Sequence, residues 1–114
     1  MSNLNNINDR DFNSQILAKK GDSLVIVDFW ASWCAPCKTM IKTLEEIYDD
    51  YKNSSKLEIL KYNIEDNSLI SSKYNILSIP TLIFFNRGLE VKKIIGLVQK
   101  QDIEKAIEEH IKKN

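Results

Sequence analysis

The chain has 114 residues, of which 43% are hydrophobic and 28% are charged, and its 16 basic residues balance 16 acidic ones. These values predict one globular domain across residues 1–114, and the balanced charge argues against nucleic acid and anionic membranes as partners. No apolar run reaches the roughly 18 residues of a membrane span, and residues 1–12 lack the basic and apolar regions of a secretory signal, so we expect a cytoplasmic protein.

The first third of the chain predicts a strand, a helix and a second strand. Residues 4–7 favour a short opening strand, and the apolar positions within residues 9–20 follow helical spacing up to Gly21. The run LVIVDFW at residues 24–30 is β-branched and aromatic, which is typical of a central strand covered on both faces. One charged residue, Asp28, interrupts this run.

The middle of the chain predicts a long helix, a strand and a short helix. Residues 35–52 carry apolar side chains at helical spacing, which indicates packing against a core. LEILKYNI at 57–64 predicts a second buried strand, and a short helix is expected around 67–74.

The last third predicts a hairpin and a final helix. TLIFF at 81–85 and VKKII at 91–95 flank the turn NRG, where Gly88 can adopt positive φ. A helix over about 99–113 completes the chain. Strand–helix–strand units give parallel pairing, so this order predicts an α/β fold with a mixed four- or five-stranded sheet flanked by four helices on both faces.

Both cysteines lie in WASWCAPCK (30–38), where the apolar strand ends and the long helix begins. Three residues apart at a helix start, Cys34 and Cys37 share one face, and their separation suits a disulfide. Free N–H groups and the helix dipole stabilise a thiolate at Cys34, whereas Cys37 lies one turn in and faces the sheet. We therefore predict an outward, attacking Cys34 and a shielded Cys37 that breaks the mixed disulfide.

Two other roles for the pair fit less well. A structural zinc site needs four ligands, and besides the two cysteines the chain has a single histidine, His110, for which we expect a packing or helix-dipole role. A purely structural disulfide would add little stability, because closing so short a loop removes little conformational entropy from the unfolded chain. We expect no bound metal and no bound cofactor.

Three further residues outside the cysteine motif attract attention. A carboxylate such as Asp28 in a central strand is usually paired or shifted in pKa; a structural anchor is one reading, and a proton-transfer role is favoured. Lys61 is its candidate partner if the two strands are neighbours, although a structural role is equally open. From the residues alone, Pro80 could be a plain strand-start proline or could form a cis bond to Ile79. The cis bond that we expect would turn the Ile79 backbone toward Cys34 and an extended substrate.

This ordered set of motifs resembles the thioredoxin family over nearly the whole chain. VDFWASWCAPCK is similar to the active-site strand and loop, and KYNIE to the strand that carries the family lysine. YNILSIPTLIFF is similar to the cis-proline segment, NRG to the hairpin turn, and IIGL to the glycine loop.

The resemblance implies a thioredoxin fold and a cytosolic dithiol–disulfide oxidoreductase. Such a protein reduces disulfides in other proteins, acts as a monomer, and is recharged from NADPH by a separate flavin enzyme, thioredoxin reductase. The resemblance implies Cys34 as the attacking cysteine, Cys37 as the resolving one, Asp28 as the buried acid/base, Lys61 as its neighbour, and Trp30 packed beneath the site. It also implies a substrate groove lined by Trp33, Ala35, Pro36, Ile79, Pro80 and Gly96.

Three positions depart from the family pattern. Ala35 stands for the usual Gly and narrows backbone freedom, Lys42 stands where a Pro commonly kinks the helix, and Glu65 replaces the usual Asp. We interpret Glu65 as a surface replacement. Two other functions stay open: a disulfide oxidase or isomerase of the same fold, which Pro36 and the bare N-terminus oppose, and a redox-independent binding subunit that uses Trp33 and Ile79.

Overall fold

The sheet has five strands in the order β1-β3-β2-β4-β5 in a computed structural model that describes residues 3–19 and 21–111. The strands are β1 (Asn5–Asn6), β2 (Leu24–Trp30), β3 (Leu57–Asn63), β4 (Thr81–Asn86) and β5 (Leu89–Ile95). β1, β3 and β2 are parallel, and β4 and β5 continue the sheet as an antiparallel pair beside β2. The mixed sheet predicted from the sequence is confirmed.

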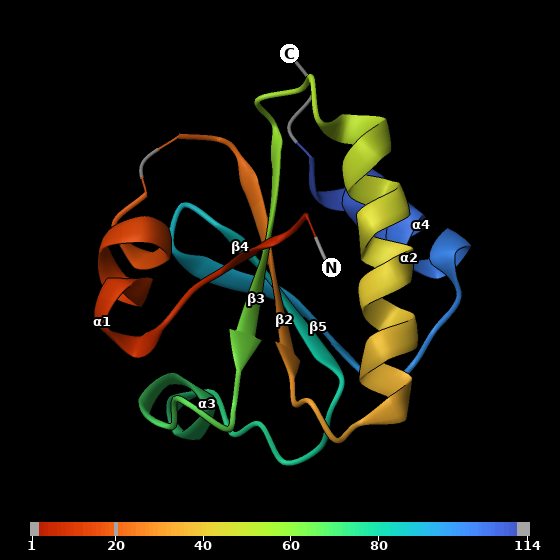
Figure 1. Cartoon of the computed structure of the whole chain (residues 1–114). Coiled ribbons are helices and arrows are strands. Elements are labelled where there is room, and N and C mark those ends of the chain that lie inside the picture. Colours follow the sequence, from red (N-terminus) through yellow and green to blue (C-terminus); the bar gives the residue numbers. More distant parts are fainter. Residues whose placement is uncertain (1–2, 20, 112–114) are drawn as a thin grey trace.

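The helices cover both faces of this sheet (Figure 1). They are α1 (Asp9–Phe12), which continues as a π-helical turn η1 (Asn13–Leu17), α2 (Ala35–Tyr51), α3 (Leu69–Lys73) and α4 (Lys100–His110). Figure 1 shows α2 and α4 together on one face, and α1 and α3 on the other.

Two apolar clusters, one on each face, explain the continuous apolar run of β2. Because successive strand residues point to opposite faces, Leu24 and Ile26 pack beneath α2 and α4, while Val25, Val27 and Phe29 pack in the second cluster. The same alternation places Asp28 on the α2 face, near the carboxyl end of its strand. β2 therefore connects the core to the cysteine segment as a rigid, fully covered element.

Some predicted boundaries were wrong. The first helix ends at Leu17, where the N–H of Ala18 donates to the carbonyl of Asn13 at 2.8 Å, and residue 20 lies outside the described residues. The last helix ends at His110, with residues 112–114 also outside them. His110 packs against the buried Phe84, with the ring centres 6.2 Å apart, and its Nδ1 lies 2.9 Å from the carbonyl oxygen of Ala106.

The hairpin turn is one residue shorter than the predicted NRG. Asn86 pairs with Leu89, so only Arg87 and Gly88 form the turn, with φ of 52° and 81°. Positive φ at both central residues is the type I′ geometry that matches the twist of two antiparallel strands. A Cβ at Gly88 would collide with the carbonyl oxygen of Leu17, so this position also requires glycine for space.

Candidate active site

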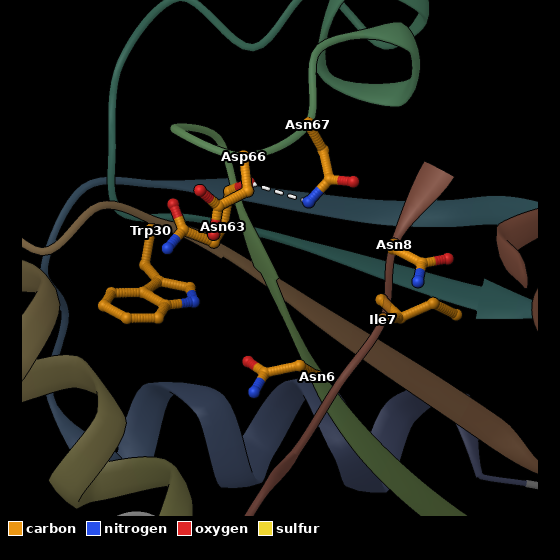
Figure 2. Close-up of a pocket in the computed structure, with 7 residues that line it drawn as sticks. All are labelled: Asn6, Ile7, Asn8, Trp30, Asn63, Asp66 and Asn67. Carbon is orange, nitrogen blue, oxygen red and sulfur yellow. Dashed lines mark hydrogen bonds between the residues drawn. The ribbon is translucent and has the colours of Figure 1, made fainter. Parts of the chain in front are cut away.

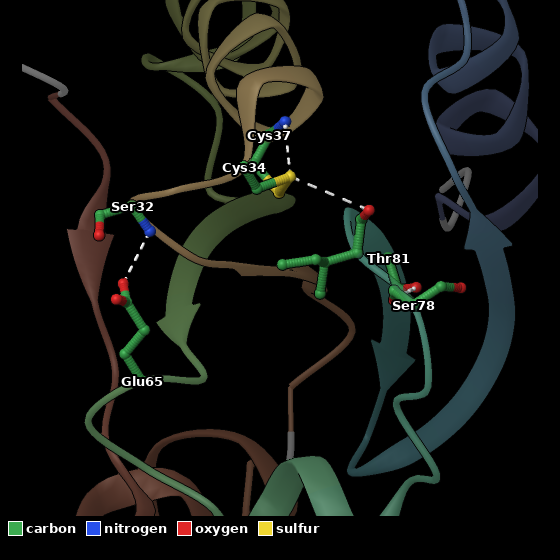
Figure 3. Close-up of a disulfide and its surroundings, with 7 residues drawn as sticks. Ser32, Cys34, Cys37, Glu65, Ser78 and Thr81 are labelled. Atoms are coloured by element: carbon green, nitrogen blue, oxygen red, sulfur yellow. Dashed lines mark hydrogen bonds between the residues drawn. A yellow bond between two sulfur atoms is a disulfide. The ribbon is translucent and has the colours of Figure 1, made fainter.

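The two cysteines form a disulfide at the N-terminus of α2, with their Cα atoms 5.2 Å apart. Cys34 is the N-cap residue, and its Sγ accepts the N–H of Cys37 at 3.2 Å (Figure 3). Pro36 lies in the first turn, where the N–H that it lacks would have had no partner within the helix. The strand-to-helix junction therefore points the N–H of Cys37 at the sulfur of Cys34.

Cys34 is less exposed than the sequence analysis expected. The exposed fraction of Cys34 is 6% and that of Cys37 is 0%. The Sγ of Cys34 is bonded to Cys37 on one side and lies 4.0 Å from the carbonyl oxygen of Ile79 on the other, which leaves little of it open to solvent. The order of exposure still agrees with the roles predicted for the two cysteines, although the difference is small.

A second segment, residues 78–81, forms one side of the disulfide's surroundings. Its Ile79–Pro80 bond is cis, as expected. The hydroxyl of Thr81 donates to the carbonyl of Ser78 at 2.7 Å, which closes the segment on itself (Figure 3). Gly96, with φ of 89°, donates its N–H to the carbonyl of Pro80 at 2.8 Å. The structure thus brings Ile79, Pro80 and Gly96 together, as the groove assignment requires.

Asp28 is the buried charge of the site. Its side chain is 0% exposed, and neither carboxylate oxygen has a hydrogen-bond partner among the described residues. Burial raises the pKa of Asp28 to about 8, with the positive charge of Lys61 opposing the shift. Lys61 lies directly across from Asp28 in the β2–β3 register, so the two strands are neighbours as predicted. Close to neutral pH this carboxyl group can both hold and release a proton.

The comparisons with known proteins agree with this geometry. The sequence model of the thioredoxin family matches residues 3–109. The chain belongs to the thioredoxin family. Among the curated relatives are thioredoxins of Staphylococcus aureus strains Mu50, MW2 and N315, each 37% identical over 105 residues, which is 92% of this chain and 95% of the relative.

Membership of the thioredoxin family, together with the Cys34–Cys37 pair, makes the chain a thiol–disulfide oxidoreductase with protein-disulfide reductase activity. The redox group of the family is this disulfide and not a bound cofactor. Within residues 3–19 and 21–111, no three His, Cys, Asp or Glu side chains are grouped to hold a metal ion. In the same part of the chain, none of the helices is long and apolar enough to cross a membrane.

The segment between β2 and α2 carries the exposed part of the thioredoxin-family motif. Trp33 is 69% exposed, and Ala35 and Pro36 are also exposed. The backbone N–H of Ser32 donates to Oε1 of Glu65 at 2.7 Å (Figure 3). This contact was not predicted from the sequence, in which Glu65 was interpreted as a surface replacement. Only the departure from the family Asp marked the position.

Lys42, the other departure within α2, is exposed, and the helix is continuous from Ala35 to Tyr51.

A cavity of about 470 Å³ lies at the carboxyl ends of β1, β2 and β3. Figure 2 shows its lining: Asn6, Ile7, Asn8, Trp30, Asn63, Asp66 and Asn67. Neither cysteine lines it, so the cavity and the disulfide are separate features. Trp30, expected beneath the active site, borders this cavity, and the Nζ of Lys61 lies 5.2 Å from the centre of its ring.

Proposed function

We propose that the chain reduces disulfides in cytosolic target proteins, as a cytoplasmic monomer with one domain, and is recharged by an NADPH-dependent thioredoxin reductase. The observation that carries this proposal is the Cys34–Cys37 disulfide at the start of α2, on the face of β2 that also holds Asp28. Within the described residues, the carboxylate oxygens of Asp28 have no hydrogen-bond partner. The 37% identity to S. aureus thioredoxins, over 95% of their length, supports the carrier function.

In the first half-reaction, the Cys34 thiolate attacks one sulfur of the substrate disulfide. A bond forms between Cys34 and that sulfur, the substrate S–S bond breaks, and the other substrate sulfur leaves as a thiolate that takes a proton from solvent. The N–H of Cys37 and the positive end of α2 stabilise the attacking thiolate.

In the second half-reaction, Cys37 releases the substrate. Asp28 accepts the Cys37 thiol proton, directly or through a water molecule, because it lies on the α2 face near the end of β2 and is ionisable near neutral pH. The Cys37 thiolate then attacks the sulfur of Cys34, the mixed disulfide breaks, and the second substrate thiolate leaves. Two electrons have passed from the dithiol to the substrate. The positive charge of Lys61 favours the ionised form of Asp28, which is the form that accepts the proton.

The substrate chain lies across the exposed surface beside Cys34. Backbone groups of Ile79 pair with an extended substrate, as an added strand does, while the cis-proline segment and Gly96 form one wall of the groove. Trp33, Ala35 and Pro36 form the opposite wall.

The deciding experiment is insulin reduction driven by NADPH and a thioredoxin reductase. Wild-type protein is expected to precipitate the insulin B chain and consume NADPH, and the Cys34→Ser/Cys37→Ser double variant is expected to do neither. A wild-type protein that is never reduced by the reductase, or that leaves insulin intact, would contradict the proposal. A partner retained equally by the double variant would instead favour the binding-subunit function.

A further inference from the structure

The segment that leads from β2 to α2 is tied to the end of β3 at two points. The carbonyl of Trp30 accepts the N–H of Ile64 at 3.0 Å, a backbone contact that continues the pairing of the two strands. One residue after Ile64, beyond the end of β3, the side chain of Glu65 accepts the N–H of Ser32 at 2.7 Å. The second tie depends on a side chain, so a single substitution can remove it without altering the strands.

Glu65 is itself held in place. Its own N–H donates to Oδ1 of Asn63 at 2.8 Å, which forms an Asx turn directly after β3. The hydrogen bond from Ser32 holds the pKa of Glu65 below its usual value, so the carboxylate is ionised at neutral pH. A hydrogen bond to an ionised acceptor is roughly twice as strong as one between neutral groups.

The residue that follows this tie is Trp33. Because Trp33 is 69% exposed, burial against the core does not fix its ring. Cys34, by contrast, is fixed by α2 itself, since it caps the helix and its sulfur accepts the N–H of Cys37. The tie from Glu65 therefore affects the Trp33 side of the site more than the sulfur.

We propose that Glu65 is a positioning residue: by binding the N–H of Ser32, it holds Trp33 in the orientation in which it contacts a protein substrate. This inference rests on the proposed function, which assigns Trp33 to the substrate groove. Without the carboxylate, Ser32 and Trp33 adopt more conformations, and a protein substrate must order them on binding. The loss falls on recognition and leaves most of the sulfur chemistry in place.

The first test compares Glu65→Ala and Glu65→Gln in steady-state reduction of insulin. Glu65→Ala is expected to raise KM about fivefold, the effect of one lost hydrogen bond, with a smaller change in kcat. Glu65→Gln keeps an oxygen that can accept the Ser32 N–H and is expected to recover most of the loss. With a small aromatic disulfide, 5,5′-dithiobis(2-nitrobenzoic acid), the loss for Glu65→Ala is expected to be smaller, because this substrate needs less of the Trp33 surface.

Asp66→Ala is the matched control. It removes the same charge one residue away, from an exposed carboxylate for which the described residues include no hydrogen-bond or ion-pair partner. Its KM for insulin is expected to equal that of the wild type. An equal rise in KM for Asp66→Ala and Glu65→Ala would assign the effect to charge and overturn the proposal, as would an unchanged KM for Glu65→Ala.

A second test does not depend on turnover. In the oxidised protein, the amide proton of Ser32 is expected to shift with pH as Glu65 titrates, with a midpoint below that of an ordinary glutamate, and this response is expected to vanish in Glu65→Gln. A Ser32 amide that does not respond between pH 3 and pH 6 would show that the contact is absent, and would overturn the inference even in an active protein. Failure of the proposed function would look different, since wild-type protein would then reduce no insulin while the amide still titrated.

Discussion

Two aspartates on opposite faces of the sheet have opposite surroundings. Asp28, on the α2 face, is fully buried, and its carboxylate oxygens have no hydrogen-bond partner within the described residues. Asp9 begins α1 on the other face, and its carboxylate accepts the hydroxyl of Tyr62. It also accepts three N–H groups at the start of α3, those of Ser68, Leu69 and Ile70.

Burial acts in the same direction on both carboxylates, and the donors around them make the difference. Burial raises the pKa of Asp28 to about 8, and Lys61 offsets only part of the shift. Burial alone would also raise the pKa of Asp9, but the hydrogen bonds from Tyr62 and from the α3 N–H groups outweigh it and lower the pKa. A carboxylate that accepts several hydrogen bonds stays ionised and holds neighbouring segments together. A buried carboxylate without such hydrogen bonds can exchange a proton near neutral pH.

The largest effect is expected from substitution of the cysteines, which lie on the same face of the sheet as Asp28. Cys34→Ser is expected to abolish insulin reduction, and Cys37→Ser to accumulate substrates as mixed disulfides on Cys34, because no thiol remains to resolve them. Non-reducing electrophoresis and mass spectrometry distinguish the two variants. In the reduced wild type, iodoacetamide is expected to modify Cys34 before Cys37; the reverse order would contradict the assignment of the attacking cysteine.

The next largest effect is expected on stability. The pKa of Asp28 is about 8 in the folded protein, against an ordinary value of 3.8 for an aspartate. Folding therefore takes up a proton between these pH values, and the stability of the wild type falls as pH rises through that window. One proton changes the free energy of unfolding by at most about 1.4 kcal/mol per pH unit. Between pH 5 and pH 8, Asp28→Asn is therefore expected to gain up to about 4 kcal/mol relative to the wild type.

Urea denaturation of the oxidised proteins at both pH values measures this gain. Asp22→Asn is a suitable control, because it removes the same charge from the surface, where Asp22 pairs with Arg87. Equal pH dependence for wild type and Asp28→Asn would mean that Asp28 titrates normally, and the contrast with Asp9 would fail.

On the other face, Asp9→Ala is expected to destabilise the protein by about 3 kcal/mol at pH 7, because it removes the acceptor for Tyr62 and for the α3 N–H groups. Tyr62→Phe removes a single donor and is expected to cost about 1 kcal/mol. Since the folded-state pKa of Asp9 is lowered, its contribution is present above the ordinary value of 3.8 and is lost as pH falls through the folded pKa. Urea denaturation at pH 7 measures both variants; a cost below about 0.5 kcal/mol for Asp9→Ala would place it among ordinary surface aspartates.

The two aspartates also show what the sequence could predict. Asp28 is visible in the sequence because an acid within a buried strand breaks a local pattern, and the same pattern predicted the double burial of β2. Asp9 gives no such signal, since its donors are 53 to 61 residues away in the chain. The contact of Glu65 with Ser32 spans 33 residues and was missed for the same reason.

The errors in the fold have a related origin. The elements themselves follow from local periodicity, and all of them are present. The hairpin turn was placed one residue too long, because the pairing of Asn86 with Leu89 depends on the register of two strands rather than on the turn residues alone. The first helix ends at Leu17, whose backbone lies close to Gly88 of that hairpin, and no local pattern predicts this contact.

The last effect expected is kinetic, and it tests whether Asp28 accepts a proton during the reaction. Asp28→Asn is expected to slow the resolution of the mixed disulfide about a hundredfold at pH 7, the lower end of the range for loss of a general base. The attack by Cys34 is expected to change much less, because the N–H of Cys37 and the α2 dipole stabilise that thiolate without Asp28. Single-turnover experiments separate the steps: the Cys37→Ser background reports the attack alone, and the full dithiol reports release of the substrate. As pH rises above the ordinary thiol range, the Asn variant should approach the wild-type rate, since Cys37 then loses its proton to hydroxide. Equal slowing of both half-reactions, or a defect that high pH does not relieve, would show that Asp28 shapes the site without accepting the proton.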